Sequence, residues 1–224
     1  MTSMQVENSI HEKGFKHIKK LIIGGGPISN QLLEKIENQS TKCYQTFGMT
    51  ETVSHIAIRE LNNSKIDDPY ECLNHVKIST NKSGVLIINS TKLNIESLTT
   101  NDLVQLTGNE QFKYIGRSDN IINSGGIKVH PETLEKEIEK ILKCKDFFID
   151  KIDDIDLGEK IIIIALKTIE KEKLKKALGE INDQKIVPKS ILFCNHFYYT
   201  PNNKINRKKS KFEALKTNKL ISMK

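Results

Sequence analysis

The sequence predicts an α/β module followed by a smaller α+β module. A strand, a glycine-rich turn and a helix start follow one another over residues 18–36. Short alternating strands separated by Asn, Ser, Gly and Lys turns fill residues 52–100. A hairpin, a proline-led helix and further strands follow Asp119. We expect the first module to cover residues 1–117 and the second to cover residues 118–224.

The net charge of +7 is confined to the end of the chain. Residues 204–224 carry eight Lys and Arg and one Glu, and the preceding 203 residues carry 27 basic and 27 acidic side chains. A basic tail is more often a solvated helix end than a binding stripe, so we expect no nucleic acid partner.

No stretch of the sequence predicts a membrane span or a signal peptide. The longest apolar run, residues 161–166, has the length and β-branching of a buried strand, and the first 20 residues are polar and of mixed charge. The four cysteines lie far apart and form no CxxC pair, which predicts neither a zinc site nor a disulfide framework. A reducing, cytoplasmic location fits this pattern.

The first strand leads into a glycine loop. Residues 1–14 predict no regular element, residues 18–23 predict a strand, and Gly24, Gly25, Gly26 and Pro27 follow it. Ser29 is a candidate N-cap for the next helix. Such a turn can bring backbone amides close to a nucleotide, but this segment alone favours a tight turn that uses glycine only for its positive φ.

A second loop with reactive side chains follows a strand predicted at residues 43–45. Here Phe47 can stack on a purine, Thr50 can reach a phosphate oxygen, and Glu51 can hold Mg²⁺. Gly48 lies between the aromatic ring and the hydroxyl. The alternative is a polar loop over a buried phenylalanine.

Two acids and an arginine mark the junction of the modules. We expect Thr100, Asn101 and Asp102 at the end of a strand, and Arg117 shortly before Asp119. A carboxylate can accept hydrogen bonds from two vicinal hydroxyls, and a guanidinium can hold a phosphate through two parallel N–H bonds. This pairing suits a nucleotide.

The second module contains a hairpin and three helices. Strands at residues 121–122 and 127–129 flank Gly125 and Gly126, and Pro131 opens a helix at its favoured first position. Strands are predicted at residues 147–151, 160–166 and 190–193, with a helix from about Glu170 to Leu178 and a final basic helix after residue 207.

Together these segments resemble the AMP-forming adenylating enzymes, the superfamily of acyl-CoA synthetases, peptide synthetase adenylation domains and luciferases. The matching segments, in the family's order, are Gly24-Gly25-Gly26-Pro27, Phe47-Gly48-Met49-Thr50-Glu51, Thr100-Asn101-Asp102, Gly116-Arg117-Ser118-Asp119, Gly125-Gly126 with Pro131 and Glu135, and Pro201-Asn202-Asn203-Lys204. Within the family, residues 44–55 resemble the o-succinylbenzoate–CoA ligases of menaquinone biosynthesis. The resemblance implies the C-terminal part of the large adenylate-forming domain, an α/β sheet plus a small β unit, followed by a small mobile α+β domain.

The resemblance also implies an ATP-dependent acid–CoA ligase with ATP, Mg²⁺ and coenzyme A as cofactors and substrates. The glycine loop and Phe47 would bind adenine, Thr50 phosphate, and Glu51 Mg²⁺. Asp102 would bind the ribose hydroxyls, and Arg117 the ribose and phosphate.

In the second module the resemblance assigns Lys204 to the acid and the α-phosphate. Asp119 would be the hinge, Gly125 and Gly126 would line the tunnel for the CoA thiol, and Lys128 would touch CoA phosphate, although a solvated lysine is equally expected there.

Three positions depart from the family pattern. Asn101 and Asn203 replace glycines, and Thr133 replaces a glutamate. Asn tolerates a positive φ, so we expect the two turns to survive.

Nothing before Gly24 matches the family's phosphate loop. We therefore expect the C-terminal part of a ligase that does not adenylate acids efficiently without the missing N-terminal part. A ligase for another aromatic or fatty acid, and a non-catalytic nucleotide-binding or interaction module, remain alternatives.

Overall fold

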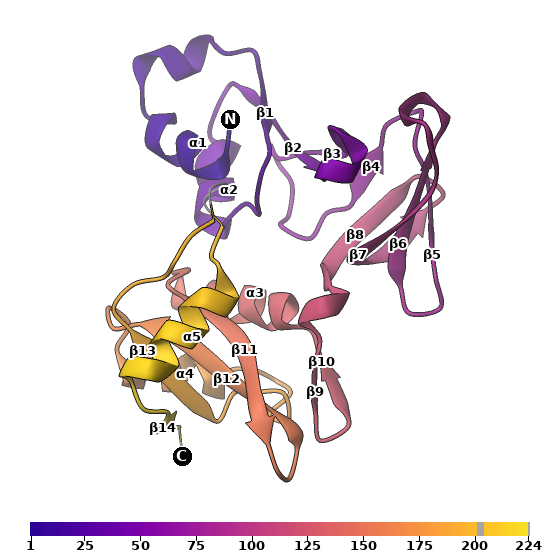
Figure 1. The fold of residues 1–224 in the computed structure, drawn as a ribbon. Coiled ribbons are helices and arrows are strands. Elements are labelled where there is room, and N and C mark those ends of the chain that lie inside the picture. The colour runs from indigo at the N-terminus through magenta and orange to yellow at the C-terminus, as the bar shows by residue number, and fades with distance from the viewer. Residues whose placement is uncertain (201–203, 224) are drawn as a thin grey trace. The chain divides into compact units, whose positions relative to one another are not determined.

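The computed structural model describes residues 1–200 and 204–223. The chain forms two compact units, Met1–Ile115 and Gly116–Lys224, and each is described by itself (Figure 1). The predicted mixture of an α/β part and an α+β part is confirmed. No helix among the described residues combines the length and the apolar character that crossing a membrane requires.

The first unit is built on one eight-stranded sheet of order β1-β2-β3-β4-β8-β7-β6-β5. Its strands are β1 (Lys20–Ile23), β2 (Lys42–Gly48), β3 (His55–Glu60), β4 (Tyr70–Cys72), β5 (Lys77–Thr80), β6 (Val85–Ser90), β7 (Ile95–Gly108) and β8 (Gln111–Arg117). β1 and β2 are parallel, and the pairs β2–β3, β3–β4, β4–β8, β5–β6 and β6–β7 are antiparallel. The pairing therefore changes from parallel to antiparallel at β2.

Two helices accompany this sheet, α1 (Ser3–Ser9) and α2 (Asn30–Glu37). The Ser29 hydroxyl accepts a hydrogen bond from the Leu32 amide at 3.0 Å, so the predicted N-cap is confirmed. The expectation of no regular element before residue 14 is wrong, because α1 begins with a capping box between Thr2 and Gln5. The spacing Thr2-x-x-Gln5 is a signature of such a box, but a helix of seven residues with one buried side chain shows little periodicity.

The first unit has two apolar clusters. One joins α1 and α2 to β1 and β2 around Val6, Ile23, Leu32 and Ile36, all fully buried. The other packs the antiparallel part of the sheet through side chains such as Leu86, Ile88 and Phe112. Phe47 and Tyr114, two partly buried aromatic side chains, pack against the second cluster.

The second unit is built on a six-stranded sheet, in which the path β10-β9-β12-β13-β14 is joined by β11, paired to β12. Its elements are β9 (Ile122–Ser124), β10 (Ile127–Val129), α3 (Pro131–Leu142), β11 (Phe147–Asp154), β12 (Gly158–Leu166), α4 (Lys171–Gly179), β13 (Ser190–Cys194), α5 (Arg207–Thr217) and β14 (Ile221–Ser222). α3 begins at Pro131 as predicted and buries Leu134, Ile138 and Leu142 at helical spacing.

The apolar run predicted as a buried strand forms the centre of this unit. In β12, Ile161, Ile163 and Ala165 join the cluster that packs α3 and α4, whereas Ile162 and Ile164 join the cluster on the other face with Ala214 of α5. Side chains alternate between the faces of a strand, so a strand that is covered on both faces must be apolar at every position. α3 and α4 therefore cover one face of the sheet and α5 the other (Figure 1).

Candidate active site

The glycine loop lies beside the end of β2. Residues 24–27 follow β1, where Ile23 pairs with Gln45 of the parallel strand β2. The Thr46 hydroxyl lies 3.4 Å from the Ile23 carbonyl, and a side chain on Gly24 would meet that hydroxyl at 2.9 Å. Because parallel neighbours end at one edge of a sheet, the fold brings the glycine loop to the residues that follow β2.

The loop is also a tight turn, as the alternative interpretation expected. Of its three glycines only Gly25 has a positive φ, at 85°. The Gly24 amide donates to the Met1 carbonyl at 3.0 Å, and the Ser3 hydroxyl donates to the Pro27 carbonyl at 3.1 Å. The start of the chain therefore braces both ends of the loop.

Two buried polar residues that the sequence analysis did not single out support the loop from the other side. The Gln45 amide donates to the Gly26 carbonyl at 2.9 Å, and its oxygen accepts from Nε and Nη2 of Arg59 at 2.9 and 2.6 Å. Arg59 also donates from Nη1 to the carbonyls of Ile66 and Asp68 at 2.6 and 3.1 Å. The available signal was a Gln in the strand predicted at residues 43–45 and an Arg within the short alternating strands expected over residues 52–100.

Phe47 lies within β2 rather than in a loop after it, because the strand continues to Gly48. This corrects the strand end predicted at residue 45. The Phe47 ring packs against Phe112, Tyr70 and Tyr114 with centroid distances of 5.1, 5.6 and 5.9 Å. The ring is half-buried in an aromatic cluster, which fixes its orientation whatever it contacts on its exposed side.

Thr50 and Glu51 are exposed in a short 3₁₀ turn, Thr50–Thr52. Fully buried Thr52 holds this turn. Its hydroxyl accepts from the Met49 amide at 3.1 Å and lies 2.7 Å from the Ser54 carbonyl. Two polar side chains are therefore presented to solvent from a fixed turn at the end of β2.

The predicted strand end at residues 100–102 is wrong, because these residues lie inside β7. The pairing shifts there: Val85 and Ile87 of β6 face Leu103 and Thr99, so the segment between them bulges. Asn101 is not among the described residues with a positive φ, so the asparagine needs no special tolerance.

The bulge fixes the position of Asp102, which is only 8% exposed. Its amide donates to the Thr100 hydroxyl at 3.0 Å, and that hydroxyl donates to the Leu86 carbonyl at 3.0 Å. An irregularity of this kind often re-aims a side chain next to an active site.

Arg117 and Asp119 pair with each other in the second unit. The guanidinium donates from Nε and Nη2 to the two carboxylate oxygens at 2.9 and 2.8 Å. The hydrogen bond from Arg117 lowers the pKa of Asp119 below its ordinary value. The side chains are 41% and 52% exposed, so both stay open to further partners.

Gly125 and Gly126 form the two-residue turn of the β9–β10 hairpin, as predicted. Ser124 pairs with Ile127 across the turn, and the two glycines have φ of 58° and 81°. A turn with two positive φ values matches the twist of a hairpin and favours glycine. Lys128 is exposed on β10. That the two glycines line a tunnel for CoA stays a prediction.

Lys204 is exposed and lies three residues before the start of α5 at Arg207. Its carbonyl accepts from the Thr200 amide at 2.8 Å, and its own amide donates to the Thr200 hydroxyl at 3.1 Å. Its ammonium group forms no hydrogen bond or ion pair with any residue in the described part of the chain. The predicted motif residues Pro201, Asn202 and Asn203 lie outside the described residues.

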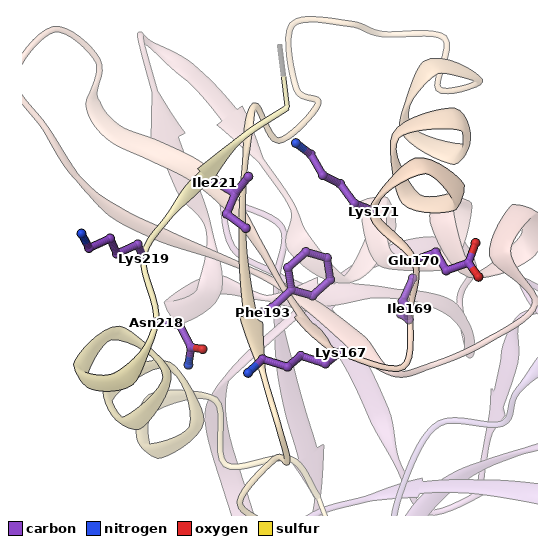
Figure 2. Close-up of a pocket in the computed structure, with 8 residues that line it drawn as sticks. All are labelled: Lys167, Ile169, Glu170, Lys171, Phe193, Asn218, Lys219 and Ile221. Carbon is purple, nitrogen blue, oxygen red and sulfur yellow. The ribbon is translucent and has the colours of Figure 1, made fainter.

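A cavity of about 540 Å³ lies elsewhere in the second unit (Figure 2). Its lining residues are Lys167, Ile169, Glu170, Lys171, Phe193, Asn218, Lys219 and Ile221. None of the site residues predicted from the sequence lines it. Among the described residues, no group of three or more His, Cys, Asp and Glu side chains is placed to hold a metal ion, so Glu51 is a single candidate ligand.

No protein-family model matches the sequence. A curated relative, 2-succinylbenzoate–CoA ligase from Listeria monocytogenes, is 22% identical over 214 residues, covering 87% of this chain and 46% of the relative. The chain therefore spans about half the length of the curated ligases that it matches.

Several solved structures are similar to this chain in fold. An AMP-forming acyl-CoA synthetase-like protein from Dyadobacter fermentans is 30% identical with a TM-score of 0.51, covering 96% of this chain and 64% of its own. The o-succinylbenzoate–CoA synthetase of Bacillus subtilis, solved with an acyl-adenylate intermediate, is 18% identical with a TM-score of 0.80, covering 93% and 49%. The Bacillus enzyme has also been solved with ATP and a magnesium ion.

These similarities confirm the predicted resemblance. In sequence and in fold, this chain is similar to the C-terminal part of the AMP-forming adenylating enzymes, and within them to the 2-succinylbenzoate–CoA ligases.

Proposed function

We propose that the chain is the C-terminal part of an ATP-dependent acid–CoA ligase of menaquinone biosynthesis, and that its acid is o-succinylbenzoate. In the first step a carboxylate oxygen attacks the α-phosphorus of ATP, giving an acyl adenylate and pyrophosphate. In the second step the CoA thiol attacks the acyl carbon, the thioester forms, the thiol proton leaves, and AMP departs. Both steps require a bound nucleotide.

The observation that carries the proposal is the meeting of two loops at one edge of the first sheet. The register of β1 and β2 brings Gly24 against Thr46, and therefore brings residues 24–27 to residues 47–51. In α/β sheets, ligands collect at the carboxyl ends of parallel strands. We assign adenine to the glycine loop and to the exposed side of Phe47.

The remaining roles follow the chemistry of each side chain. Asp102 accepts from the ribose hydroxyls, Thr50 donates to a phosphate oxygen, and Glu51 holds Mg²⁺, which would neutralise phosphate charge. Arg117 donates to ribose and phosphate. Its fork is held by Asp119, so nucleotide binding has to compete with that ion pair.

Lys204 serves the first step. Negative charge builds on the α-phosphate and on the attacking acid during an in-line displacement, and an ammonium group stabilises it there. We assign residues 118–224 to a mobile domain with its hinge at Asp119, so that Lys204 withdraws after the first step and Gly125, Gly126 and Lys128 serve CoA. The N-terminal part of a ligase is the expected partner, and the four free thiols agree with a cytoplasmic location.

Nucleotide binding by this chain can be tested directly. We expect saturable binding of AMP by calorimetry and a loss of at least tenfold in affinity for Asp102→Ala, since a buried ribose acceptor is removed. Glu96→Ala, an exposed acid on the same strand, is the matched control and should leave the affinity unchanged. A chain that shows no saturable AMP binding would be a scaffold and not a nucleotide site.

The acid is tested on a protein extended upstream to include a phosphate loop. Pyrophosphate exchange should be fastest with o-succinylbenzoate and slower with benzoate and fatty acids. Fastest exchange with a fatty acid would favour the alternative ligase. If exchange is rapid and Lys204→Ala leaves it unchanged, the role of the lysine is wrong.

A further inference from the structure

A partly buried ion pair joins α3 to the first residue of α5 in the second unit. Arg207 donates from Nη1 and Nη2 to the two carboxylate oxygens of Glu135, at 2.7 Å each. Glu135 also accepts from the Ile149 amide at 2.7 Å, and Arg207 donates to the Ile149 carbonyl at 3.1 Å. The pair therefore closes a network with the backbone of β11, although 72 residues separate its members along the chain.

The network is specific for an arginine. The guanidinium also lies 5.5 Å from the ring centroid of Phe148, and its donors are divided between two oxygens of one carboxylate and a carbonyl. An ammonium group is a point charge and cannot reproduce this planar fork. Burial raises the pKa of Glu135, an effect that Arg207 beside it opposes.

Arg207 stands three residues after Lys204. The Asn206 side chain caps α5 by accepting from the Lys209 amide at 3.1 Å, and the Asn206 amide donates to the Tyr198 carbonyl at 2.8 Å. The Tyr198 amide in turn donates to the Ser210 hydroxyl at 2.9 Å. The chain before and after Lys204 is thus tied to the first turn of α5.

Further hydrogen bonds hold Lys204 itself. Tyr199 and Ile205 form an isolated antiparallel bridge, and Thr200 bonds to both the amide and the carbonyl of Lys204. A second ion pair, Lys211 to Asp150 at 2.7 Å, holds the next turn of α5 to β11. The position of the lysine backbone therefore depends on where α5 begins, and Arg207 fixes that point.

We infer that Glu135 and Arg207 are positioning residues for Lys204, so that α3 sets the place from which the lysine approaches the acid and the α-phosphate. This inference rests on the proposed role of Lys204 and adds the residues through which that role is set. Neither side chain touches a substrate in this assignment. A displacement of about 1 Å of a reacting group can reduce a rate by about a hundredfold, so the pair has a large effect on the first step alone.

Whether the ion pair holds the backbone at Lys204 can be tested on the chain itself. Glu135→Gln keeps an acceptor for the Ile149 amide but loses the charge pair, and Arg207→Lys keeps the charge but loses the fork. Amide hydrogen exchange, read by mass spectrometry, should accelerate by at least tenfold in the peptide that contains Lys204, while peptides from β12 keep their rates. Glu213→Gln, which removes an exposed ion pair with Lys216 on the same helix, is the matched control.

The effect of the ion pair on catalysis is tested on the upstream-extended ligase, with each half-reaction measured separately. Pyrophosphate exchange should lose roughly 10- to 100-fold in kcat with an unchanged KM for ATP in both Glu135→Gln and Arg207→Lys. Thioester formation from preformed acyl adenylate should keep its rate, because that step does not use Lys204. We expect the double variant Glu135→Asp with Arg207→Lys to recover neither the rate of pyrophosphate exchange nor the hydrogen-exchange protection of the Lys204 peptide. Aspartate does not restore the reach of the glutamate, and lysine does not restore the fork of the arginine.

Two results separate failure of this inference from failure of the proposed function. If Lys204→Ala abolishes exchange but both pair variants exchange pyrophosphate normally, the positioning role is wrong and the ligase assignment stands. If Lys204→Ala has no effect, the lysine role itself is wrong. Equal losses in both half-reactions, with faster hydrogen exchange in β12, would show a general structural defect and would also overturn the inference.

Discussion

Gly48 has no space for a side chain. A Cβ at this position would lie 2.4 Å from the Ser54 carbonyl oxygen and 2.7 Å from the His55 Cα, and both are backbone atoms that cannot rotate away. From the sequence, Gly48 was expected in the loop after β2, whereas in the structure it lets β2 and β3 approach at the irregular pair Gly48–His55.

We therefore predict that Gly48→Ala lowers the free energy of unfolding by about 2 kcal/mol or more, because overpacking against fixed atoms costs energy of this order. Urea denaturation followed by circular dichroism measures it. Gly26→Ala is the matched control: a Cβ there meets nothing within 4 Å, and its φ is not positive. A Gly48→Ala protein as stable as the control would contradict the packing argument.

The pair formed by Arg117 and Asp119 gives a pH-dependent signal. The hydrogen bond from Arg117 lowers the pKa of Asp119 in the folded protein, with the arginine's charge acting in the same direction. For an acid with a lowered pKa, the stabilisation is present above the unfolded pKa and is lost as the pH falls through the folded pKa.

Carbon-detected NMR of the Asp119 carboxyl group should show a titration midpoint below that of an ordinary aspartate. Arg117→Ala should raise the midpoint, and Lys113→Ala should leave it in place. A midpoint that does not respond to loss of Arg117 would mean that the fork is not formed in solution.

At the scale of elements, sequence patterns predicted the helices and turns that have a periodic or capping signal. They missed the strand ends that depend on pairing with neighbouring strands. The helix at Pro131, the Ser29 cap and the glycine hairpin were read from local chemistry that the structure keeps. The continuation of β2 to Gly48 and of β7 through Asp102 was not readable, because polar residues in a strand resemble a turn until their partner strands are known.

In the candidate site, too, the sequence revealed local patterns but not contacts between distant segments. The motif residues were found because each has a side chain with recognisable chemistry. Gln45, Arg59 and Arg207 were missed because their importance lies in buried or partly buried contacts with residues on other elements. Such supporting residues carry no local pattern.

β12 is the element on which the second unit depends most. Ile162 and Ile163 are fully buried on opposite faces of the same strand. We predict that Ile162→Ala and Ile163→Ala each cost about 3 kcal/mol, because each deletion leaves a cavity in a separate cluster.

Ile155→Ala is the control for these variants, since Ile155 is fully exposed at the β11–β12 turn and should change stability by less than about 0.5 kcal/mol. Chemical denaturation of the three variants gives the comparison. A small effect for Ile162 beside a large one for Ile163 would show that α5 does not cover its face of the sheet in solution.

At the scale of the whole molecule, each apolar cluster stays within one unit. The two clusters of the first unit draw on residues between Val6 and Tyr114, and the two clusters of the second draw on residues between Ile122 and Met223. A domain that contains its own core can fold alone. The boundary at Ile115 and Gly116 falls within β8, where no cluster is divided.

We therefore predict that a fragment of residues 116–224 folds by itself and unfolds in one cooperative transition. Its calorimetric Tm should match the corresponding transition of the full chain, and Ile162→Ala should lower both by the same amount, since the side chain packs in a cluster of its own unit. Leu86→Ala in the first unit should leave that transition unchanged. An unfolded fragment, or a Tm that responds to Leu86→Ala, would mean that the two units stabilise each other, and a rigid pair of units could not separate the two half-reactions by movement of Lys204.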